Sequence, residues 1–333
     1  MFSLTILIPT WDRPGQVNQR LREIDRLWEG SVPVKIQVNP GQYSAKDIDI
    51  SLYSGSVDVV QNLVNLGLFG SIAMGVQGIV TEWLWILGDD DSLQPDAREN
   101  IEQALSLAAR EGVDALLFNQ WNNTLNGPRY TLCRELSSFM KATGFGNPLF
   151  ISGCMWRTGF LKSNLRLLIE YSFSVASHVL IYIVALASQS SSVLVVDQPL
   201  IDYEYAHRWN RLGYLQRVFL LFRHPNVWTH RKDVINFVWP QTRWALQSAA
   251  HEQLKNGEAT LLDWLRGAWE VVRFQFICAP PAKALGRTLE IGFIILEVYS
   301  IPRLFTMVVR RFWKIRTGPI STQPTNPERP LGL

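Results

Sequence analysis

Residues 83–92, with the sequence WLWILGDDDS, decide the fold of this chain. An apolar run that is typical of a buried strand ends abruptly in a glycine and three aspartates, Asp89, Asp90 and Asp91. Three adjacent like charges repel one another unless a cation or a hydrogen-bond donor neutralises them. At the end of a strand inside a sheet, the triplet predicts a site for Mg²⁺ or Mn²⁺, which take oxygen ligands. The alternative is a solvated acidic turn that caps the following helix.

Apolar runs and helical patterns alternate on both sides of this stretch. The apolar runs predict strands at residues 3–8, 33–38, 58–60, 83–87, 115–119 and 193–196. Apolar residues at helical spacing predict helices at residues 17–28, 68–80, 95–111 and 161–187. Strands that alternate with helices predict an α/β fold with a Rossmann-like, mostly parallel, doubly wound sheet.

Three polar loops follow strands of this predicted sheet, at residues 9–13, 39–41 and 88–92. Ligands of open α/β sheets bind beyond the carboxyl ends of the strands. We therefore expect the three loops to meet at one edge of the sheet and to form the functional site there.

The composition fits a globular protein with a partly apolar surface. The chain has 333 residues, of which 47% are hydrophobic and 18% charged, and it contains 13 tryptophans. This length suffices for one large α/β domain with a helical extension. The formal net charge of +3 is too small to favour nucleic acid as a partner.

The cysteine pattern and the hydropathy favour a cytoplasmic protein. Cys133, Cys154 and Cys278 are far apart and form no metal-binding pattern, so we expect buried thiols in a reducing compartment. The apolar run near the start is interrupted by Pro9, which argues against a signal peptide. No uninterrupted apolar run approaches the length of a membrane-spanning helix.

Four segments together carry a resemblance to a known family. They are residues 4–13 (LTILIPTWDR), 62–67 (NLVNLG), 70–78 (GSIAMGVQG) and 83–91 (WLWILGDDD). Their order and spacing resemble family 2 glycosyltransferases, which are inverting enzymes with the GT-A fold and an Asp-x-Asp motif. The resemblance covers roughly residues 1–205, and it implies a nucleoside-diphosphate sugar donor and a Mg²⁺ or Mn²⁺ cofactor.

The resemblance also implies roles for individual residues of the donor site. Asp91 matches the direct metal ligand, Asp89 matches the aspartate that faces the ribose and sugar near the metal, and Asp90 has the least certain role. Asn39 falls where the family usually has an aspartate that hydrogen-bonds the nucleobase, and its amide can still donate and accept. The other residues expected around the nucleotide are Pro9, Thr10, Asp12, Arg13 and Asn65.

An inverting transfer needs a general base that accepts the proton of the acceptor hydroxyl. The family usually supplies a carboxylate, often in an acidic pair, but residues 170–178 contain no such pair. We expect His178 to be the base, because neutral imidazole can accept a proton near pH 7. Glu170 is the second candidate. The alternative for His178 is a histidine that packs near the start of a helix.

Residues 150–157 (FISGCMWR) resemble the family's segment beneath the acceptor sugar. Ser152, Gly153 and Trp156 are therefore the expected acceptor-side residues, and tryptophan stacks well on sugar faces. With so many tryptophans in the chain, packing in the core is the alternative for Trp156.

The C-terminal third is helical, aromatic and basic in pattern. We expect a GT-A domain at residues 1–210, a helical extension at 211–316, and a disordered tail at 317–333. Residues 300–316 contain five basic residues and no acid, with basic and apolar side chains on opposite sides of a helix. This pattern is typical of a helix that lies on an anionic membrane surface. A helix packed on the catalytic domain is the alternative.

Together these features predict a metal-dependent, inverting glycosyltransferase. It would transfer a sugar to a hydroxyl of a glycan or polyprenyl-linked acceptor, at the cytoplasmic face of a bacterial membrane, in cell-surface polysaccharide synthesis. One rival is a nucleotidyltransferase that makes nucleotide-sugars, although its usual Gly-rich N-terminal loop is missing here. The other rival is a non-catalytic glycan-binding descendant.

Overall fold

The computed structural model describes residues 3–120, 128–174, 176–202, 211–250 and 260–298. Its centre is an eight-stranded sheet with the strand order β3-β2-β1-β4-β8-β6-β9-β7. The strands are β1 (Leu4–Trp11), β2 (Val34–Asn39), β3 (Val57–Gln61), β4 (Trp83–Ile86), β6 (Ala115–Phe118), β7 (Tyr130–Cys133), β8 (Cys154–Arg157) and β9 (Val193–Val196). A separate antiparallel pair joins β5 (Ser92–Leu93) to β10 (Ile201–Asp202).

The sheet is mostly parallel, which confirms the predicted α/β class. Strands β3, β2, β1 and β4 are parallel neighbours, and β6 is parallel to β9. Strand β8 runs antiparallel between β4 and β6, and β7 runs antiparallel to β9. The sequence analysis did not predict β8, because its four residues alternate in no recognisable pattern and follow a short helical turn.

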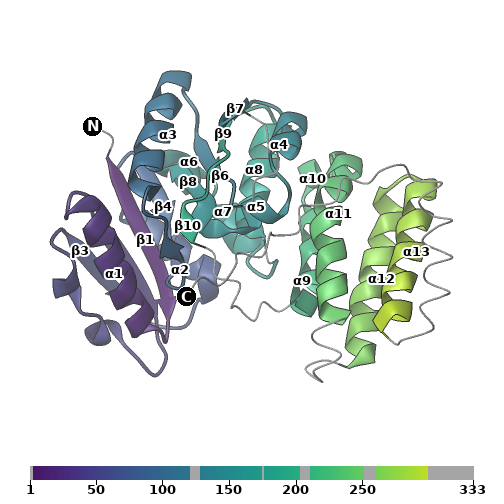
Figure 1. Ribbon diagram of the computed structural model, residues 1–333, viewed down its shortest axis with the longest axis horizontal. Coiled ribbons are helices and arrows are strands. Elements are labelled where there is room, and N and C mark those ends of the chain that lie inside the picture. Colours follow the sequence, from purple (N-terminus) through teal and green to yellow (C-terminus); the bar gives the residue numbers. More distant parts are fainter. Residues whose placement is uncertain (1–2, 121–127, 175, 203–210, 251–259, 299–333) are drawn as a thin grey trace, which may run out of the picture.

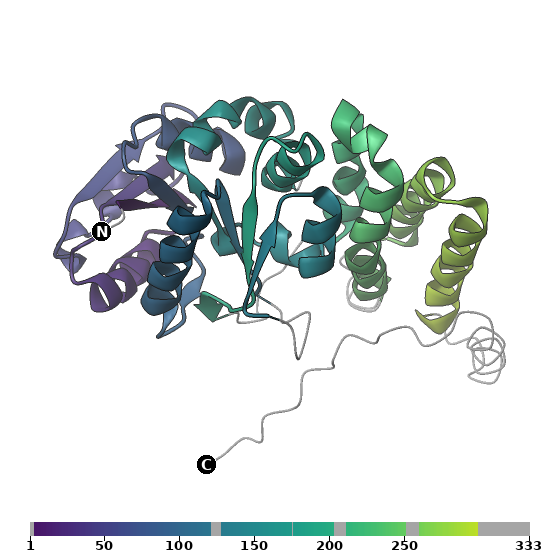
Figure 2. The ribbon, with the colours of Figure 1, turned by 90° about the horizontal axis from the view of Figure 1, so that it is seen from above.

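Helices cover both faces of the sheet (Figure 1, Figure 2). Side chains alternate along β1, so that Ile6 and Ile8 join the core beneath α1 (Pro14–Trp28) and α3 (Ala97–Glu111). Leu7 points to the opposite core, beneath α2 (Gly67–Gln77). The small residues of α2 allow this close packing, since a Cβ on Gly75 would lie 2.7 Å from the Leu7 side chain.

Short helices complete the α/β part of the chain. They are η1 (Ala45–Asp47), η2 (Ile50–Leu52), α4 (Leu136–Ala142), α5 (Gly146–Leu149), η3 (Ile151–Gly153), α6 (Thr158–Ser163), α7 (Leu165–Glu170) and α8 (Ser177–Ala187).

A group of helices lies beside the α/β part (Figure 1, Figure 2). The group consists of α9 (Arg211–Arg217), η4 (Val218–Arg223), α10 (Pro225–Thr229), α11 (Arg231–Ser248), α12 (Leu261–Cys278) and α13 (Pro281–Val298). One apolar cluster continues from the sheet into these helices. Phe237 of α11, for example, packs edge-on against Phe145, with ring centroids 5.2 Å apart. Within the described residues, no helix is both long enough and apolar enough to cross a bilayer.

Candidate active site at the carboxyl edge of the sheet

The loops that follow β1 and β4 come together at the carboxyl edge of the sheet. Thr10 Oγ1, near the end of β1, donates a hydrogen bond of 2.6 Å to Asp89 Oδ2. Arg13 Nη1 lies 3.2 Å from Asp89 Oδ1 and 2.7 Å from Asp90 Oδ2. One guanidinium nitrogen therefore neutralises two adjacent carboxylates. We call Thr10, Arg13, Asp89, Asp90 and Asp91 the rim cluster.

Asp89 is the most enclosed charge of the rim cluster. It is only 7% exposed. Burial raises the pKa of the Asp89 carboxyl, and the neighbouring Asp90 adds to this effect, while the hydrogen bond from Thr10 and the charge of Arg13 oppose it. Perturbed carboxylates of this kind are enriched at functional sites.

Asp91 is held by the backbone turn and by a distant serine. Ser152 Oγ donates a 2.5 Å hydrogen bond to Asp91 Oδ2 and accepts a 2.8 Å hydrogen bond from the Gly88 amide. The Asp91 carboxylate folds so closely over Gly88 that a Cβ at Gly88 would lie 2.4 Å from its Oδ2. Any side chain at position 88 would displace the Asp91 carboxylate from this place. Ser152 thus supports the acidic turn, and its expected acceptor-side role stays a prediction.

Arg20 supports the same turn from α1. Its Nη1 donates hydrogen bonds of 2.6 Å to the backbone oxygen of Asp91 and to Glu23 Oε2. Glu23 in turn accepts a 3.0 Å hydrogen bond from the Leu93 amide. The sequence analysis missed this pair. A buried arginine three residues before a glutamate in a helix was the available signal, but the burial could not be seen from the sequence.

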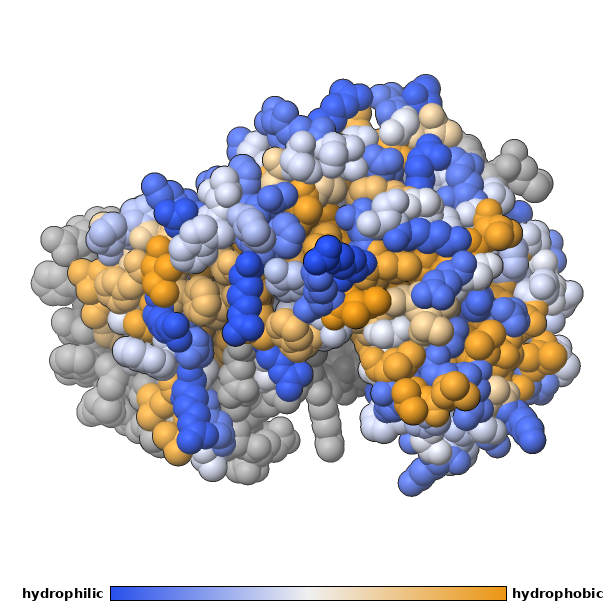
Figure 3. Space-filling model, turned by 180° about the vertical axis from the view of Figure 1, so that it is seen from behind, coloured by the Kyte–Doolittle hydropathy of each residue, from blue (hydrophilic) through white to orange (hydrophobic). Residues whose placement is uncertain are grey.

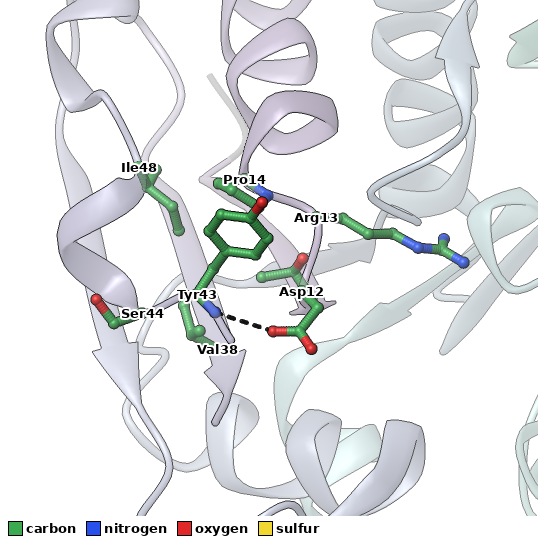
Figure 4. A pocket seen from close by; sticks show the side chains of 8 residues that line it. Asp12, Arg13, Pro14, Val38, Tyr43, Ser44 and Ile48 are labelled. Carbon is green, nitrogen blue, oxygen red and sulfur yellow. Dashed lines mark hydrogen bonds between the residues drawn. The ribbon is translucent and has the colours of Figure 1, made fainter. Parts of the chain in front are cut away.

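A small hollow opens next to the rim cluster (Figure 4). It is lined by Thr10, Asp12, Arg13, Pro14, Val38, Tyr43, Ser44 and Ile48. Asp12 adopts a positive φ of 55°, and its Oδ1 accepts a 3.1 Å hydrogen bond from the Tyr43 amide. A Cβ at Gly41 would lie 2.1 Å from the same oxygen. Asp12 thus ties the loop after β2 to the loop after β1 and presents the Tyr43 ring beside the hollow.

Asn39 does not face this hollow as a free amide. Its Oδ1 accepts hydrogen bonds from Asn62 Nδ2 at 2.9 Å and from the Leu66 amide at 3.1 Å. Its Nδ2 donates to the Gly67 carbonyl at 3.3 Å. Both polar atoms of the amide thus have partners inside the protein, and the expected contact with a nucleobase stays a prediction.

Asn39 belongs to a buried polar network that the sequence analysis did not predict. Asn62 Oδ1 accepts a 2.6 Å hydrogen bond from Gln37 Nε2, and Asn62 Nδ2 also reaches Ser71 Oγ at 3.1 Å. We call Gln37, Asn39 and Asn62 the amide network. It pins the loop between β3 and α2 to the end of β2.

Asn65 and Pro9 have local structural roles. Asn65 is exposed in the same loop, and its Oδ1 accepts a 2.9 Å hydrogen bond from the Gly67 amide. Pro9 is buried within β1 and pairs in register with Gln37 of β2. Neither side chain borders the hollow.

The structure encloses the expected acceptor residues Gly153 and Trp156. A Cβ at Gly153 would lie 2.7 Å from the Phe118 carbonyl, so this glycine permits a close backbone approach. Trp156 lies in β8 with no exposed surface and packs against Tyr182, with ring centroids 5.9 Å apart. A fully buried indole offers no face to a sugar in this arrangement, which favours packing in the core, and the acceptor-side role of Trp156 stays a prediction.

The two candidate bases, Glu170 and His178, differ in how exposed they are. Glu170 ends α7 and accepts a 2.6 Å hydrogen bond from Arg166 Nε at the surface. His178 is 3% exposed and stacks on Phe69, with ring centroids 5.6 Å apart. Burial lowers the pKa of His178 to about 4, although the nearby backbone of Pro148 and Leu149 opposes the shift slightly. Neither ring nitrogen makes a well-aligned hydrogen bond with a described residue.

The rim cluster fits a divalent cation by its chemistry. Carboxylate oxygens are the ligands that Mg²⁺ and Mn²⁺ prefer, and Mg²⁺ is commonly held by one or two carboxylates together with substrate phosphates. Within the described ranges, no three His, Cys, Asp or Glu side chains are arranged as a complete metal cage. A cation here would therefore take part of its coordination shell from a bound diphosphate and water.

Three further regions named in the sequence analysis lie outside the described residues. They are the end of the expected GT-A domain at residues 203–210, the basic segment at 300–316 and the expected tail at 317–333.

No protein-family model and no curated protein matches this sequence. Among solved structures, the chain is similar to S. aureus TarS 1–349, with 12% identity, a TM-score of 0.54, and coverage of 93% of this chain and 92% of that one. The same TarS fragment in complex with UDP-GlcNAc gives 12% identity, a TM-score of 0.57 and the same coverage. The mannosyltransferase PcManGT from Pyrobaculum calidifontis, in complex with GDP-Man and Mn²⁺, is 13% identical, with a TM-score of 0.49 over 90% of this chain and 86% of that one. The likeness to TarS shows the GT-A fold and nothing finer.

Proposed function

We propose that this chain is a glycosyltransferase that uses a nucleoside-diphosphate sugar as donor and transfers the sugar with inversion to a hydroxyl of a glycan or lipid-linked acceptor. The observation that carries the proposal is the rim cluster, in which Arg13 and Thr10 meet the acidic turn beside a hollow at the carboxyl edge of a GT-A sheet. This edge is where open α/β sheets bind their ligands.

The donor's diphosphate would lie against the rim cluster. Arg13 is about half exposed at its side chain and already bridges Asp89 and Asp90, so it can turn toward phosphate oxygens without leaving the site. We propose Asp91 and Asp89 as the residues that hold Mg²⁺ or Mn²⁺. When bound, such an ion stabilises the negative charge that develops on a diphosphate leaving group. Ser152 and Arg20 keep the acidic turn in place.

The nucleoside would occupy the hollow beside Tyr43. An aromatic ring that lines a small pocket can stack on any nucleobase, and Figure 4 shows Tyr43 among the side chains that line the hollow while Arg13 points away from them. Asp12 supports this pocket by fixing the Tyr43 backbone. We therefore propose Tyr43, rather than Asn39, as the residue that contacts the base.

We propose His178 as the proton acceptor of the transfer, with Glu170 as the second candidate. Glu170 is tied to Arg166 at the surface. His178 is neutral in its enclosed position, and its ring reaches an acceptor only if Phe69 or the adjacent backbone moves. The variant His178→Gln tests this role first. If it transfers the sugar at the rate of the parent chain, His178 is not the general base.

We further propose a division of labour along the chain. Residues 1–210 carry the reaction, and residues 211–316 attach the protein to the cytoplasmic face of a membrane, where a polyprenyl-linked acceptor would be found. Cell-surface polysaccharide synthesis is the corresponding process.

A panel of nucleoside-diphosphate sugars, incubated with the full chain and with or without Mn²⁺, tests the proposal. We expect one donor to raise the melting temperature in a Mn²⁺-dependent manner and to release its nucleoside diphosphate when an acceptor is added. The proposal is wrong if no donor binds. It is also wrong if Asp91→Ala retains full metal-dependent turnover.

A further inference from the structure

Helix α12 is apolar on two opposite faces. The inward face is buried against the neighbouring helices through Trp264, Ala268, Val271 and Cys278. The outward face exposes a second set of large apolar side chains, of which Trp269 is 64% exposed. This set comprises Leu262, Leu265, Trp269, Phe276 and Ile277. An exposed set of large apolar side chains on a helix whose other face is already buried is typical of an interaction site.

The outward residues of α12 form a continuous stripe. Successive residues of a helix are separated by about 100°, so Leu262, Leu265, Trp269 and Phe276 fall within an arc of about 60°. We call these four residues and Ile277 the α12 stripe. Figure 3 shows a face of the molecule on which apolar side chains lie exposed over the helical part, next to hydrophilic ones.

Two exposed arginines lie beside the apolar side chains of the α12 stripe. Around the helix axis, Arg266 and Arg273 fall between Leu262 and Ile277, and the acidic Asp263 and Glu270 lie just beyond Ile277. Their distances to those carboxylates are 3.8 and 3.9 Å, which is longer than a hydrogen bond. Asp263 is in addition engaged by Thr260 at the start of the helix. Both guanidinium groups therefore remain available to an external anion.

The charge of the chain is divided unevenly between its two parts. Residues 211–316 contain 16 lysines and arginines and 7 acidic residues, a net charge of +9. Residues 1–210 contain 15 basic and 21 acidic residues, a net charge of −6. The overall charge of +3 conceals this asymmetry. The α12 stripe thus lies on the strongly basic part of the chain.

We propose that the α12 stripe docks on the surface of an anionic lipid bilayer. Tryptophan, phenylalanine and leucine enter the boundary between headgroups and acyl chains, while flanking arginines meet lipid phosphates. Since no described helix is suited to span a bilayer, α12 lies along the surface. With 18 residues it presents a contact about 27 Å long.

The charge distribution favours a bilayer over the other possible occupants of the stripe. A second copy that used the same stripe would bring two strongly basic parts together. The segment 299–316, which follows α13, adds five basic residues and no acid, so folding it back onto the stripe would also oppose like charges. An anionic bilayer instead offsets the charge of both. This inference does not depend on the transfer reaction proposed above.

Binding of the full chain to vesicles, measured without any donor, tests this proposal. We expect binding to vesicles of phosphatidylcholine mixed with phosphatidylglycerol, and much weaker binding to phosphatidylcholine alone. Trp269→Ser should weaken binding to the anionic vesicles about tenfold, because it removes one large apolar anchor. Leu63→Ser is the matched control, since Leu63 is 99% exposed but belongs to the acidic part. The control should bind as the parent chain does.

A nitroxide label at position 269 locates the contact directly. The native cysteines Cys133, Cys154 and Cys278 are buried, so Trp269→Cys is labelled selectively. We expect the label to become accessible to oxygen and shielded from a water-soluble nickel reagent when anionic vesicles are added. Failure of the parent chain to bind anionic vesicles contradicts the proposal. So do unchanged binding by Trp269→Ser, a label that is immobile before lipid is added, and a dimer that Trp269→Ser dissociates without affecting vesicle binding.

Discussion

Two groups of polar side chains lie a short distance apart at the carboxyl edge of the sheet, and they differ in how their polar atoms are used. In the rim cluster, Asp89 and Asp90 share the charge of Arg13, and burial raises the pKa of Asp89. In the amide network, Gln37, Asn39 and Asn62 satisfy one another and the adjacent loop. In the rim cluster, a bound cation or phosphate can replace the present partners of the charged side chains. The second group has no unused polar atom at Asn39.

The sequence resemblance placed both Asn39 and Asp89 at the nucleotide. Their different partners suggest different roles: we propose that Asp89 binds the ligand and that Asn39 supports a loop. A charged residue whose pKa is shifted by its surroundings is a candidate for ligand binding or catalysis. A polar residue that is neutral and fully hydrogen-bonded contributes to the fold. Substitutions in the two groups should therefore affect different quantities.

The largest effect is expected for Asp89→Asn. Transfer should fall about a hundredfold to a thousandfold, because one charge of the donor-binding site is lost. The apo protein should become more stable at pH 7. Since the folded-state pKa of Asp89 lies above the ordinary value of 3.8, its ionised form costs stability at every pH above that value.

The melting temperature and the turnover of Asp89→Asn, measured on the same preparation, test whether stability rises while activity falls. Asp58→Asn, at an exposed position of β3, is the control and should change neither quantity. A variant that lost both activity and stability would place Asp89 among the structural residues.

His178 should behave as an enclosed residue. Its pKa is lowered from 6.5 to about 4, so the unfolded chain binds a proton more readily between these values. The parent protein should therefore lose stability as the pH falls through this window, by up to about 3 kcal/mol. The variant His178→Gln should lose less stability over the same pH range.

Denaturant unfolding at pH 7 and pH 5 provides the comparison. Ser177→Ala is the neighbouring control, because it removes a buried hydroxyl that does not titrate in this range. It should lower stability equally at both pH values. If the free energy of unfolding changed equally with pH in the parent chain and in His178→Gln, His178 would not cause the pH dependence of stability.

Asn39→Asp distinguishes the two possible roles of Asn39. If Asn39 contacted the base, the aspartate that the family usually has there would preserve donor binding. In the amide network, the new carboxylate would lose its donor bond to the Gly67 carbonyl and face it as a like acceptor. We expect unfolding stability to fall by about 2 kcal/mol.

Asn65→Asp is the matched control, because Asn65 only accepts a hydrogen bond from the Gly67 amide and is exposed. Its free energy of unfolding should equal that of the parent chain. Urea titrations of both variants measure these free energies. A stable Asn39→Asp chain that binds the donor more tightly would show that Asn39 contacts the nucleobase.

Ser152→Ala should have the smallest effect of this series. It removes the hydrogen bond to Asp91 and leaves the Gly88 amide without its acceptor, which costs about 1 kcal/mol. Mn²⁺ affinity should weaken a few-fold through the less ordered Asp91. Ser163→Ala, which removes a surface hydroxyl in α6, should leave Mn²⁺ affinity unchanged.

The sequence predicted the half of the sheet that builds the rim cluster, because each strand there is a buried apolar run that ends in a polar loop. β1, β2 and β4 are of this kind, and their parallel order makes the loops meet without further information. Antiparallel β8 was missed, since nothing in CMWR marks a strand inserted between β4 and β6.

The roles of single polar residues were less predictable, because they depend on partners far away in sequence. Asn39 is satisfied by Asn62 and by the loop at residues 66–67. Ser152 reaches Asp91 across 61 positions. Trp156 and His178 carry the right chemistry at plausible spacing, but their burial is decided by the packing of β8, α2 and α8.

Titration of a nucleoside diphosphate into the full chain, with and without Mn²⁺, is the measurement that tests the central claim most directly. The parent chain should bind the diphosphate at least tenfold more tightly with Mn²⁺, and Asp91→Asn should lose this dependence while keeping its melting temperature within a few degrees. Binding that is equally tight without Mn²⁺, or a Mn²⁺ dependence that persists in Asp91→Asn, would contradict the assignment of the rim cluster as the donor site.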